Sequence, residues 1–393
     1  MNKSLYSIRI LGSLAIVLLL FASFTLTAPD WGFFGHRLIN KMAVFTLPQE
    51  MLPVYKKHIF YISQHAVDPD KRRYALKNEA YRHYIDIDHW DTIPFPNVPR
   101  DLKTAILSHA ALVGITAEND TVILNKSVRD LDSFYYELVL LDRYSKSIDL
   151  DEKDVQKFLD KKVSYAKYQF LNPFVAYGVL PYFLEDYYKV LVKVLEEGKL
   201  DNILKISAEI GHYIGDAHVP LHTTTNYNGQ LTNQLGIHAF WESRLPELYA
   251  EEEYDMVVGK AIYIEDKSSY FWNIIMESHS LLDEVLADEL ELKQTFPSDE
   301  QYCYDERLER TTRVECPEYA AAYHNSLDGM VEKRMQDAIL SIGSVWYSAW
   351  IDAGQPDLSE IVDNRDLDKL EEENKALNQA TNNNVINGRS HGN

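Results

Sequence analysis

The feature that most constrains the fold of this 393-residue chain is the run from His212 to His222, His-Tyr-Ile-Gly-Asp-Ala-His-Val-Pro-Leu-His. His212 and Asp216 are four residues apart, so on a helix an imidazole and a carboxylate share one face, one turn apart. Pro220 ends such a helix, and His222 follows in the turn. Nitrogen and oxygen donors in this arrangement suit zinc. The run therefore predicts a helix that turns one face toward a metal site.

Further candidate ligands lie on both sides of this run. His238 and Glu242 repeat the His-x-x-x-acid spacing, beginning sixteen residues after His222, and Asp68 precedes His83 by fifteen residues. Taken singly, such residues are more often surface pairs or solvated carboxylates than ligands. Counted together, they exceed what one zinc ion can hold and predict two or three ions, with these ligands: His36, Asp68, His83, His212, Asp216, His222, His238 and Glu242.

Apolar residues recur at three- and four-residue steps along most of the chain, as in 36–62, 200–217 and 318–352. Hydrophobic residues make up 46% of the sequence, which is ample for a large core. We find no convincing hairpin turn between apolar runs, and we interpret the polar segments 223–236 and 295–317 as loops. The pattern predicts an all-α fold, with one multi-helix domain over 29–362 and the metal cluster in a cleft between its helices.

Both ends of the chain differ in composition from the predicted domain. Lys3 and Arg9 precede a nearly uninterrupted apolar run at 10–24, which is typical of a signal peptide and predicts one over 1–28. An uncleaved anchor is the alternative interpretation. The last segment, 363–393, is rich in Asn, Glu and Lys and is expected to be a disordered polar tail. These features predict an exported protein, either periplasmic or extracellular.

The cysteines and the net charge limit the remaining possibilities. Cys303 and Cys316 are the only cysteines, and in an exported protein they predict one disulfide, with two free thiols as the alternative. The formal net charge of -21 disfavours long-range attraction to nucleic acid and to anionic membranes. It does not exclude a phosphate substrate, because bound metal reverses the charge locally.

Taken in order, the motifs resemble the superfamily that unites bacterial zinc-dependent phospholipases C with single-strand-specific zinc nucleases. The resemblance rests on Trp-Gly-x-x-Gly-His at 31–36, the Asp-to-His gap of fifteen, His-x-x-x-Asp-x-x-x-Pro-x-His at 212–222 and the later His-x-x-x-acid. These motifs span 31–242. The segment Trp-Tyr-Ser-Ala-Trp at 346–350 also looks like the terminal helix of that superfamily.

The resemblance implies three zinc ions. Asp68, His83, His212 and Asp216 would hold the first, and His222, His238 and Glu242 would hold the second. His36, a bridging Asp216 and the backbone of Trp31 would hold the third. A metal-bound hydroxide would attack phosphorus, Asp68 would also orient the attacking water, and Asp86 would contact a ligand imidazole.

The resemblance leaves the substrate open between two phosphodiesters. Glu242 at the last ligand position is similar to the phospholipases, whereas the gap of five between Trp31 and His36 is similar to the nucleases. We lean slightly to a nuclease acting on single-stranded nucleic acid, with a phospholipase C acting on zwitterionic phospholipid as the alternative. A secreted binding protein stapled by zinc, without catalysis, is the alternative of another class. No protein partner is implied. The superfamily uses the free amino group of an N-terminal Trp as a zinc ligand. Here Asp30 directly precedes Trp31, and Asp is a poor residue for a signal peptidase to cut after. If residues before Trp31 stay attached, this amine ligand is lost.

Overall fold

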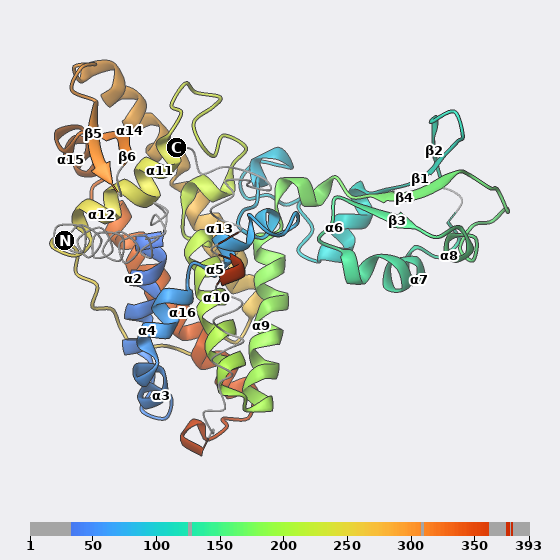
Figure 1. The fold of residues 1–393 in the computed structure, drawn as a ribbon, viewed down its shortest axis with the longest axis horizontal. Helices are drawn as coiled ribbons and strands as arrows, with labels where there is room; N and C mark the ends of the chain where they lie inside the picture. The colour runs from blue at the N-terminus through green and yellow to red at the C-terminus, as the bar shows by residue number, and fades with distance from the viewer. Residues whose placement is uncertain (1–32, 125–127, 308–309, 361–374, 378, 380–393) are drawn as a thin grey trace, which may run out of the picture.

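The structure is a computed structural model that describes residues 33–124, 128–307, 310–360, 375–377 and 379 (Figure 1). The signal peptide expected at 1–28, the ligand expected at Trp31 and almost all of the tail expected at 363–393 lie outside these residues. Among the described helices, none is long and apolar enough to cross a membrane.

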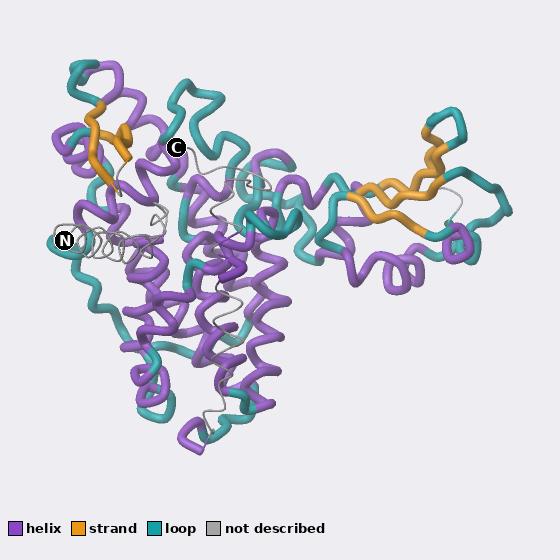
Figure 2. Tube along the Cα trace, in the orientation of Figure 1, coloured by secondary structure: helices purple, strands orange, loops and turns teal. Residues whose placement is uncertain are grey.

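The body of the molecule is built from helices, which confirms the predicted all-α class (Figures 1 and 2). Its central helix is α10 (Leu200–Ala217), in which every residue from Ser207 onward is buried. The neighbours of α10 are α2 (Phe33–Ala43), α4 (Ile59–His65), α9 (Leu180–Glu197) and α16 (Met330–Asp352).

The C-terminal end of α10 is where the sequence predicted it. The helix ends at Ala217, and the chain continues through Val219, in an extended conformation, into the short 3-10 helix η8 (Pro220–Thr223). Proline cannot continue a helix because it lacks the backbone N–H and its ring clashes with the preceding turn. The break turns the chain back, so that His222 lies close to Asp216 at the C-terminal end of α10.

Two glycines on one face of α10 allow α2 to pack closely against it. A Cβ atom at Gly211 would lie 2.0 Å from Oδ1 of Asn40, and one at Gly215 would lie 2.9 Å from Nδ1 of His36. Neither distance is tolerable for a real Cβ atom, so a larger residue at either position would push α2 away. Gly211 and Gly215 therefore allow His36 to lie beside the ligand face of α10.

Shorter elements complete the helical body. The remaining α-helices of the body are α3 (Leu52–Lys57), α5 (Asp68–Arg72), α11 (Ile237–Ala239), α12 (Leu245–Tyr249), α13 (Lys267–Ser280), α14 (Leu282–Thr295) and α15 (Pro317–Ser326). Within the described residues, the body also contains five more 3-10 helices, η1 (Val44–Thr46), η2 (Ala80–Arg82), η3 (Ile87–His89), η7 (Phe174–Tyr177) and η10 (Leu358–Glu360), and the π-helix η9 (Phe240–Arg244).

A small sheet and short helices form an arm that projects to one side of the body (Figure 2). The sheet is antiparallel in the order β2-β1-β4-β3, with β1 (Ala111–Ile115), β2 (Thr121–Ile123), β3 (Ser147–Leu150) and β4 (Lys167–Leu171). The helices of the arm are α6 (Leu102–His109), α7 (Leu131–Phe134), the π-helix η5 (Tyr135–Val139), the 3-10 helix η6 (Leu140–Asp142) and α8 (Glu152–Val155).

The arm corrects the expectation that this part of the chain is helical throughout. The strand β1 is a short apolar run, Ala-Leu-Val-Gly-Ile, whose period alone does not distinguish a buried strand from a buried helical segment. In β4 the buried residues Tyr168 and Phe170 alternate with more exposed ones, which is the period of a half-buried strand. Strand β1 pairs with the distant strand β4, with Ala111 opposite Leu171, so the centre of the sheet depends on contacts that local patterns do not show.

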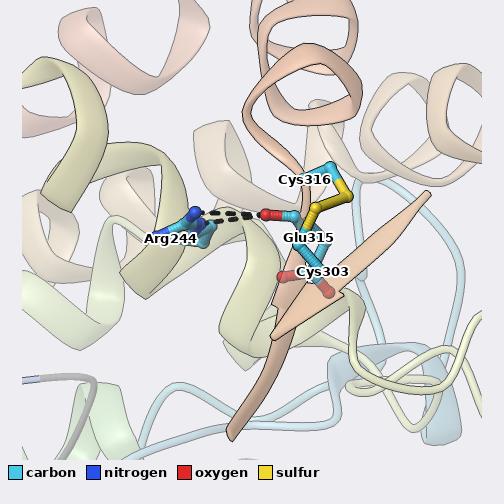
Figure 3. The surroundings of a disulfide bond; sticks show 4 residues. All are labelled: Arg244, Cys303, Glu315 and Cys316. Atoms are coloured by element: carbon cyan, nitrogen blue, oxygen red, sulfur yellow. Dashed lines mark hydrogen bonds between the residues drawn. A yellow bond between two sulfur atoms is a disulfide. The ribbon is translucent and has the colours of Figure 1, made fainter. Parts of the chain in front are cut away.

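The segment 295–317, interpreted as a loop, instead contains the antiparallel hairpin of β5 (Tyr302–Arg307) and β6 (Arg310–Glu315). A disulfide joins Cys303 to Cys316, with Cα atoms 4.9 Å apart, which confirms the predicted pair (Figure 3). Beside it, the buried Arg244 donates two hydrogen bonds to the main-chain carbonyl of Glu315, at 3.2 and 3.3 Å (Figure 3). The hairpin is therefore fastened to the π-helix η9, which also carries Glu242.

Candidate metal centre

Seven of the eight side chains expected as ligands gather at one place in the body. His36 lies on α2, His212 and Asp216 on α10, His222 in η8, His238 on α11 and Glu242 in η9, while His83 directly follows η2. All seven side chains are buried or nearly so. Together with Asp70 they form three groups in which the donor atoms lie within 4.8 Å of one another, and two of these groups share His212.

The group of His222, His238 and Glu242 agrees with the expected second ligand set. Nε2 of His238 lies 2.7 Å from Oε2 of Glu242, and Nε2 of His222 lies 3.2 Å from the same oxygen. His238 and Glu242 are one turn apart, and the π-helix η9 begins between them. Such π-helical turns occur often at functional sites.

A second group contains His36, His212 and Asp216. Nε2 of His36 lies 3.4 Å from Oδ1 of Asp216 and 3.3 Å from Oε1 of Glu242. The other oxygen of Asp216 lies 2.9 Å from Nδ1 of His83. Asp216 thus has one oxygen toward each of two groups, which is the bridging position expected for it.

The third group corrects the expectation for Asp68. The structure places Asp70, two residues further on, with His83 and His212, at 3.8 Å from Nδ1 and Nε2 respectively. Asp68 instead accepts hydrogen bonds from Nδ1 of His65 at 2.6 Å and Nζ of Lys71 at 3.1 Å.

The reason for this exchange is the geometry of α5. Asp68 and Asp70 are separated by two residues, about 200° around a helix, so they face nearly opposite sides. Asp70 faces the His83 and His212 imidazoles, whereas Asp68 faces the end of α4. Burial of the carboxyl raises the pKa of Asp68, but the contacts with His65 and Lys71 together outweigh burial and hold that pKa below its usual value.

Asp86, expected to contact a ligand imidazole, is fully buried, and its backbone N–H donates to the carbonyl of Tyr177 at 2.7 Å. The orientation of a ligand imidazole is instead visible at His222, whose Nδ1 lies 2.6 Å from the carbonyl oxygen of His83. A carbonyl can only accept, so Nδ1 carries the proton. The contact expected of Asp86 stays a prediction.

The donor set fits metal ions. With its proton on Nδ1, a neutral His222 presents a lone pair at Nε2, and this atom faces Nε2 of His238 at 2.9 Å. His212 and His83 repeat the arrangement, with Nε2 and Nδ1 separated by 3.1 Å. Ring nitrogens and carboxylate oxygens that converge in this way, away from water, are what a set of cations satisfies.

Burial favours the neutral form of the His212 imidazole and disfavours the ionised form of the Asp216 carboxyl. The pKa of His212 is well below its usual value, chiefly because the ring is buried and also because His36 is adjacent. The pKa of Asp216 is well above its usual value because of burial and because the carboxylates of Asp70 and Glu242 lie close to it. Neutral imidazoles are competent ligands, and cations would allow the neighbouring carboxylates to ionise together.

Two arginines at the centre were not identified from the sequence. Arg73, which is buried, donates from a guanidinium nitrogen to Oδ1 of Asp70 at 3.2 Å, and its charge acts on Asp216 and His238. Arg72 points the other way and donates to Oε1 of Glu209 at 2.7 Å. The only available signal was their position, two and three residues after Asp70.

A buried ionic network lies behind the centre. Its acids are Glu79 and Glu209, whose side chains are 0% and 3% exposed. Arg72 contacts both, and Arg82 donates to Glu79 at 2.7 Å. The hydroxyl of Tyr213, next to His212 in the chain, donates to Glu79. The network joins the segment that carries Asp70 and His83 to the helix that carries His212.

Comparison with known proteins adds no identification to this geometry. No protein-family model matches the chain, and no curated protein matches it.

Proposed function

We propose that the chain is a zinc-dependent phosphodiester hydrolase that acts outside the cytoplasm. The observation that carries the proposal is the occurrence, at one place in the body, of three groups of imidazoles and carboxylates, two of which share His212. We assign Asp70, His83 and His212 to the first ion, His222, His238 and Glu242 to the second, and His36 with Asp216 to the third. The backbone of Trp31, two residues before α2, remains the expected further ligand of the third ion.

When bound, the zinc ions would supply an activated water near neutral pH and positive charge for phosphate oxygens. The side chains account for the rest of the chemistry. Asp216 has one oxygen toward each of two groups and would hold two ions close together. Arg73, paired with Asp70, would add a fixed positive charge for a phosphate oxygen and for the charge that develops on it. We transfer to Asp70 the role of orienting the attacking water that was expected of Asp68.

The composition of the centre favours catalysis over a structural staple. Structural zinc sites are typically closed, four-coordinate and rich in cysteine. Here the groups contain no cysteine, because both cysteines form the disulfide. The side chains of Asp70 and Glu242 retain 12% and 11% exposure, against 5% or less for the histidines and Asp216. Substrate would therefore approach the ions from the side of these two carboxylates.

Single-stranded nucleic acid is the substrate that we favour slightly, with zwitterionic phospholipid as the alternative. The phospholipid alternative is supported by Glu242, because Glu at the last ligand position is similar to the phospholipases. A secreted binding protein that uses zinc only as a staple remains the candidate of another class, and loss of the metal would then unfold it without any catalytic loss to measure.

Hydrolysis by the purified protein, with and without chelation, tests the proposal. The substrates are bis(p-nitrophenyl) phosphate, a single-stranded oligonucleotide and phosphatidylcholine. We expect release of nitrophenol that chelator abolishes and added zinc restores, with either natural substrate cleaved in the same way. The variant Asp70→Asn should lose at least about a hundredfold in kcat, the lower end of what a positioned general base contributes, whereas Asp68→Asn is the matched control outside the donor groups.

Three outcomes of this experiment differ in meaning. Loss of activity in Asp70→Asn with helix content retained supports catalysis at the centre. Greater loss in Asp68→Asn than in Asp70→Asn would contradict the assignment of Asp70. Zinc-dependent folding without hydrolysis of any of the three substrates would contradict the hydrolase and support the staple.

A further inference from the structure

The segment that carries His238 and Glu242 is held by a part of the chain that has no role in the proposed chemistry. That part consists of the hairpin of β5 and β6, the disulfide and α15, and we call it the disulfide region. Two side chains of the π-helix η9 contact it: Phe240, two residues before Glu242, and Arg244, two residues after it. Both are buried, at 2% and 6% exposure. The disulfide region therefore contacts η9 on either side of the ligand in the sequence.

Arg244 connects η9 to the disulfide itself (Figure 3). Two nitrogens of its guanidinium donate to the main-chain carbonyl of Glu315, at 3.2 and 3.3 Å. Glu315 directly precedes Cys316, which the disulfide joins to Cys303. The N–H of Cys316 also donates to the carbonyl of Gln301 at 3.0 Å. Because the bridge and this hydrogen bond restrain the residue that follows it, the Glu315 carbonyl is held close to Arg244.

Phe240 connects η9 to α15, the helix that begins directly after Cys316. Its ring lies 5.5 Å from that of Tyr319, at an interplanar angle of 21°, and 4.8 Å from that of Tyr323. All three rings are 2% exposed or less. The hydroxyl of Tyr323 donates in turn to the carbonyl of Val285 on α14, at 2.8 Å. The aromatic contact is therefore part of the core and fixes η9 against α15.

Glu289 on α14 connects the disulfide region to the segment before His238. This carboxylate is 3% exposed and accepts from the hydroxyl of Tyr319 at 2.9 Å and from the amide of Gln234 at 2.6 Å. Gln234 lies four residues before His238, and its carbonyl accepts from the N–H of Ile237, the first residue of α11, at 3.0 Å. Both ligands that α11 and η9 provide to the second ion are thus connected to the disulfide region.

The donors of the other two groups are held mainly by other elements. His212 and Asp216 lie on α10, which packs closely against α2, and the ionic network of Glu79 and Glu209 lies behind them. His36 lies on α2. A change in the disulfide region should therefore affect the second ion before the other two.

We propose that the disulfide region positions His238 and Glu242 and thereby sets the affinity of the centre for the second ion, with little effect on the other two. Arg244, Tyr319 and Glu289 are positioning residues, since they act through the two ligands. Replacing a residue that supports a metal ligand typically lowers metal affinity by about 10- to 100-fold. The proposal rests on the proposed function, in particular on the assignment of both ligands to the same ion.

Zinc binding tests the proposal without turnover. It is measured at a series of free zinc concentrations set by a metal buffer, and the bound ions are counted by elemental mass spectrometry. We expect Arg244→Met to weaken the affinity for one of three ions by about 10- to 100-fold and to leave the other two unchanged. Arg244→Lys keeps a charged donor and should recover part of the loss. The variant with both cysteines replaced by serine should behave like Arg244→Met, and it adds no thiol that would itself bind zinc.

Tyr319→Phe separates positioning from a general loss of stability. It keeps the ring and removes only the hydroxyl that donates to Glu289, so it should weaken binding of the same ion, by less than Arg244→Met. The matched control is Tyr188→Phe, because Tyr188 is also buried, at 6% exposure, and donates to a carboxylate oxygen of Asp352 at 2.6 Å, outside the donor groups. Tyr188→Phe should bind zinc like the wild type.

The ion that is lost is identified with His238→Ala, which removes a ligand of the second ion directly. Adding Arg244→Met to His238→Ala should cost no further zinc, because both changes act on the same ion. A further loss in the double variant would overturn the proposal. So would unchanged zinc affinity in Arg244→Met, equal weakening of all ions, or the same weakening in Tyr188→Phe. If the serine variant does not fold, Arg244→Met and Tyr319→Phe, which keep the disulfide, decide the outcome.

Failure of the proposed function is distinguishable because it appears in the wild type. Three zinc ions without zinc-dependent release of nitrophenol would contradict the hydrolase, and the zinc affinities of the variants would still decide this proposal. A wild type that binds one zinc ion or none would contradict both.

Discussion

Replacing Arg72 tests the buried ionic network behind the metal centre. The side chains of Glu79 and Glu209 are 0% and 3% exposed, and Arg72 and Arg82 balance their two charges. In Arg72→Met, Glu209 keeps the hydroxyl of Tyr187 as a donor but loses its cation. Removing one partner of a buried ion pair typically costs about 3–5 kcal/mol, because the remaining charge stays desolvated.

The free energy of unfolding, measured by urea titration, should therefore fall by about 3–5 kcal/mol in Arg72→Met. Burial alone would lower the pKa of Arg72, but the carboxylate of Glu209 and its neighbours hold that pKa well above its usual value, so the guanidinium is charged across the range of the assay. The double variant Arg72→Met with Glu209→Gln removes both charges and should recover more than half of the loss.

Arg129→Met is the matched control, because Arg129 and its partner Asp160 are 57% and 55% exposed. Exposed pairs of this kind contribute about 0–1 kcal/mol. The reasoning is refuted if Arg72→Met and Arg129→Met lose the same amount, or if the double variant is less stable than Arg72→Met alone.

Two further predictions concern stability elsewhere in the body. Burial and the charge of Arg334 hold the pKa of His218 well below 6.5, so below that pH the unfolded chain binds a proton that the folded chain rejects, and stability falls. Between pH 7.5 and 5.5, the free energy of unfolding from urea titration should fall less in His218→Gln than in the wild type, by up to about 1.4 kcal/mol per pH unit. An equal fall in the two proteins would contradict the lowered pKa of His218. Replacing Cys303 and Cys316 by serine should cost about 3 kcal/mol by the same titration, which in the chain-entropy model is the value for a loop of this size. Reductant should lower the stability of the wild type to that of the double serine variant and leave the variant unchanged.

The helical body and most of the donor groups could be predicted from the sequence because both depend on local spacing. His212 and Asp216 share a helix face whatever surrounds them, and Pro220 must end that helix. The same holds for His238 and Glu242, although the π-helical turn between them was not foreseen.

Features that depend on distant partners were not predicted. Between Asp68 and Asp70, both in one short helix, the choice is made by what each side of α5 meets: His65 and Lys71 on one side, and His83 and His212 on the other. The spacing between Asp and His in the sequence does not show which of the two carboxylates faces the histidines. The β-sheet of the arm and the hairpin at the disulfide also depend on pairings between segments whose individual patterns are ambiguous.

The most direct test of the account is to measure, by elemental mass spectrometry, the zinc content of the purified wild type and of the variants Asp70→Asn and Asp216→Asn. We predict about three zinc ions per chain in the wild type, a loss of one ion in Asp70→Asn, and a larger loss in Asp216→Asn because it bridges two groups. One zinc ion or none in the wild type, or equal and unchanged contents in both variants, would contradict a multinuclear centre around Asp216.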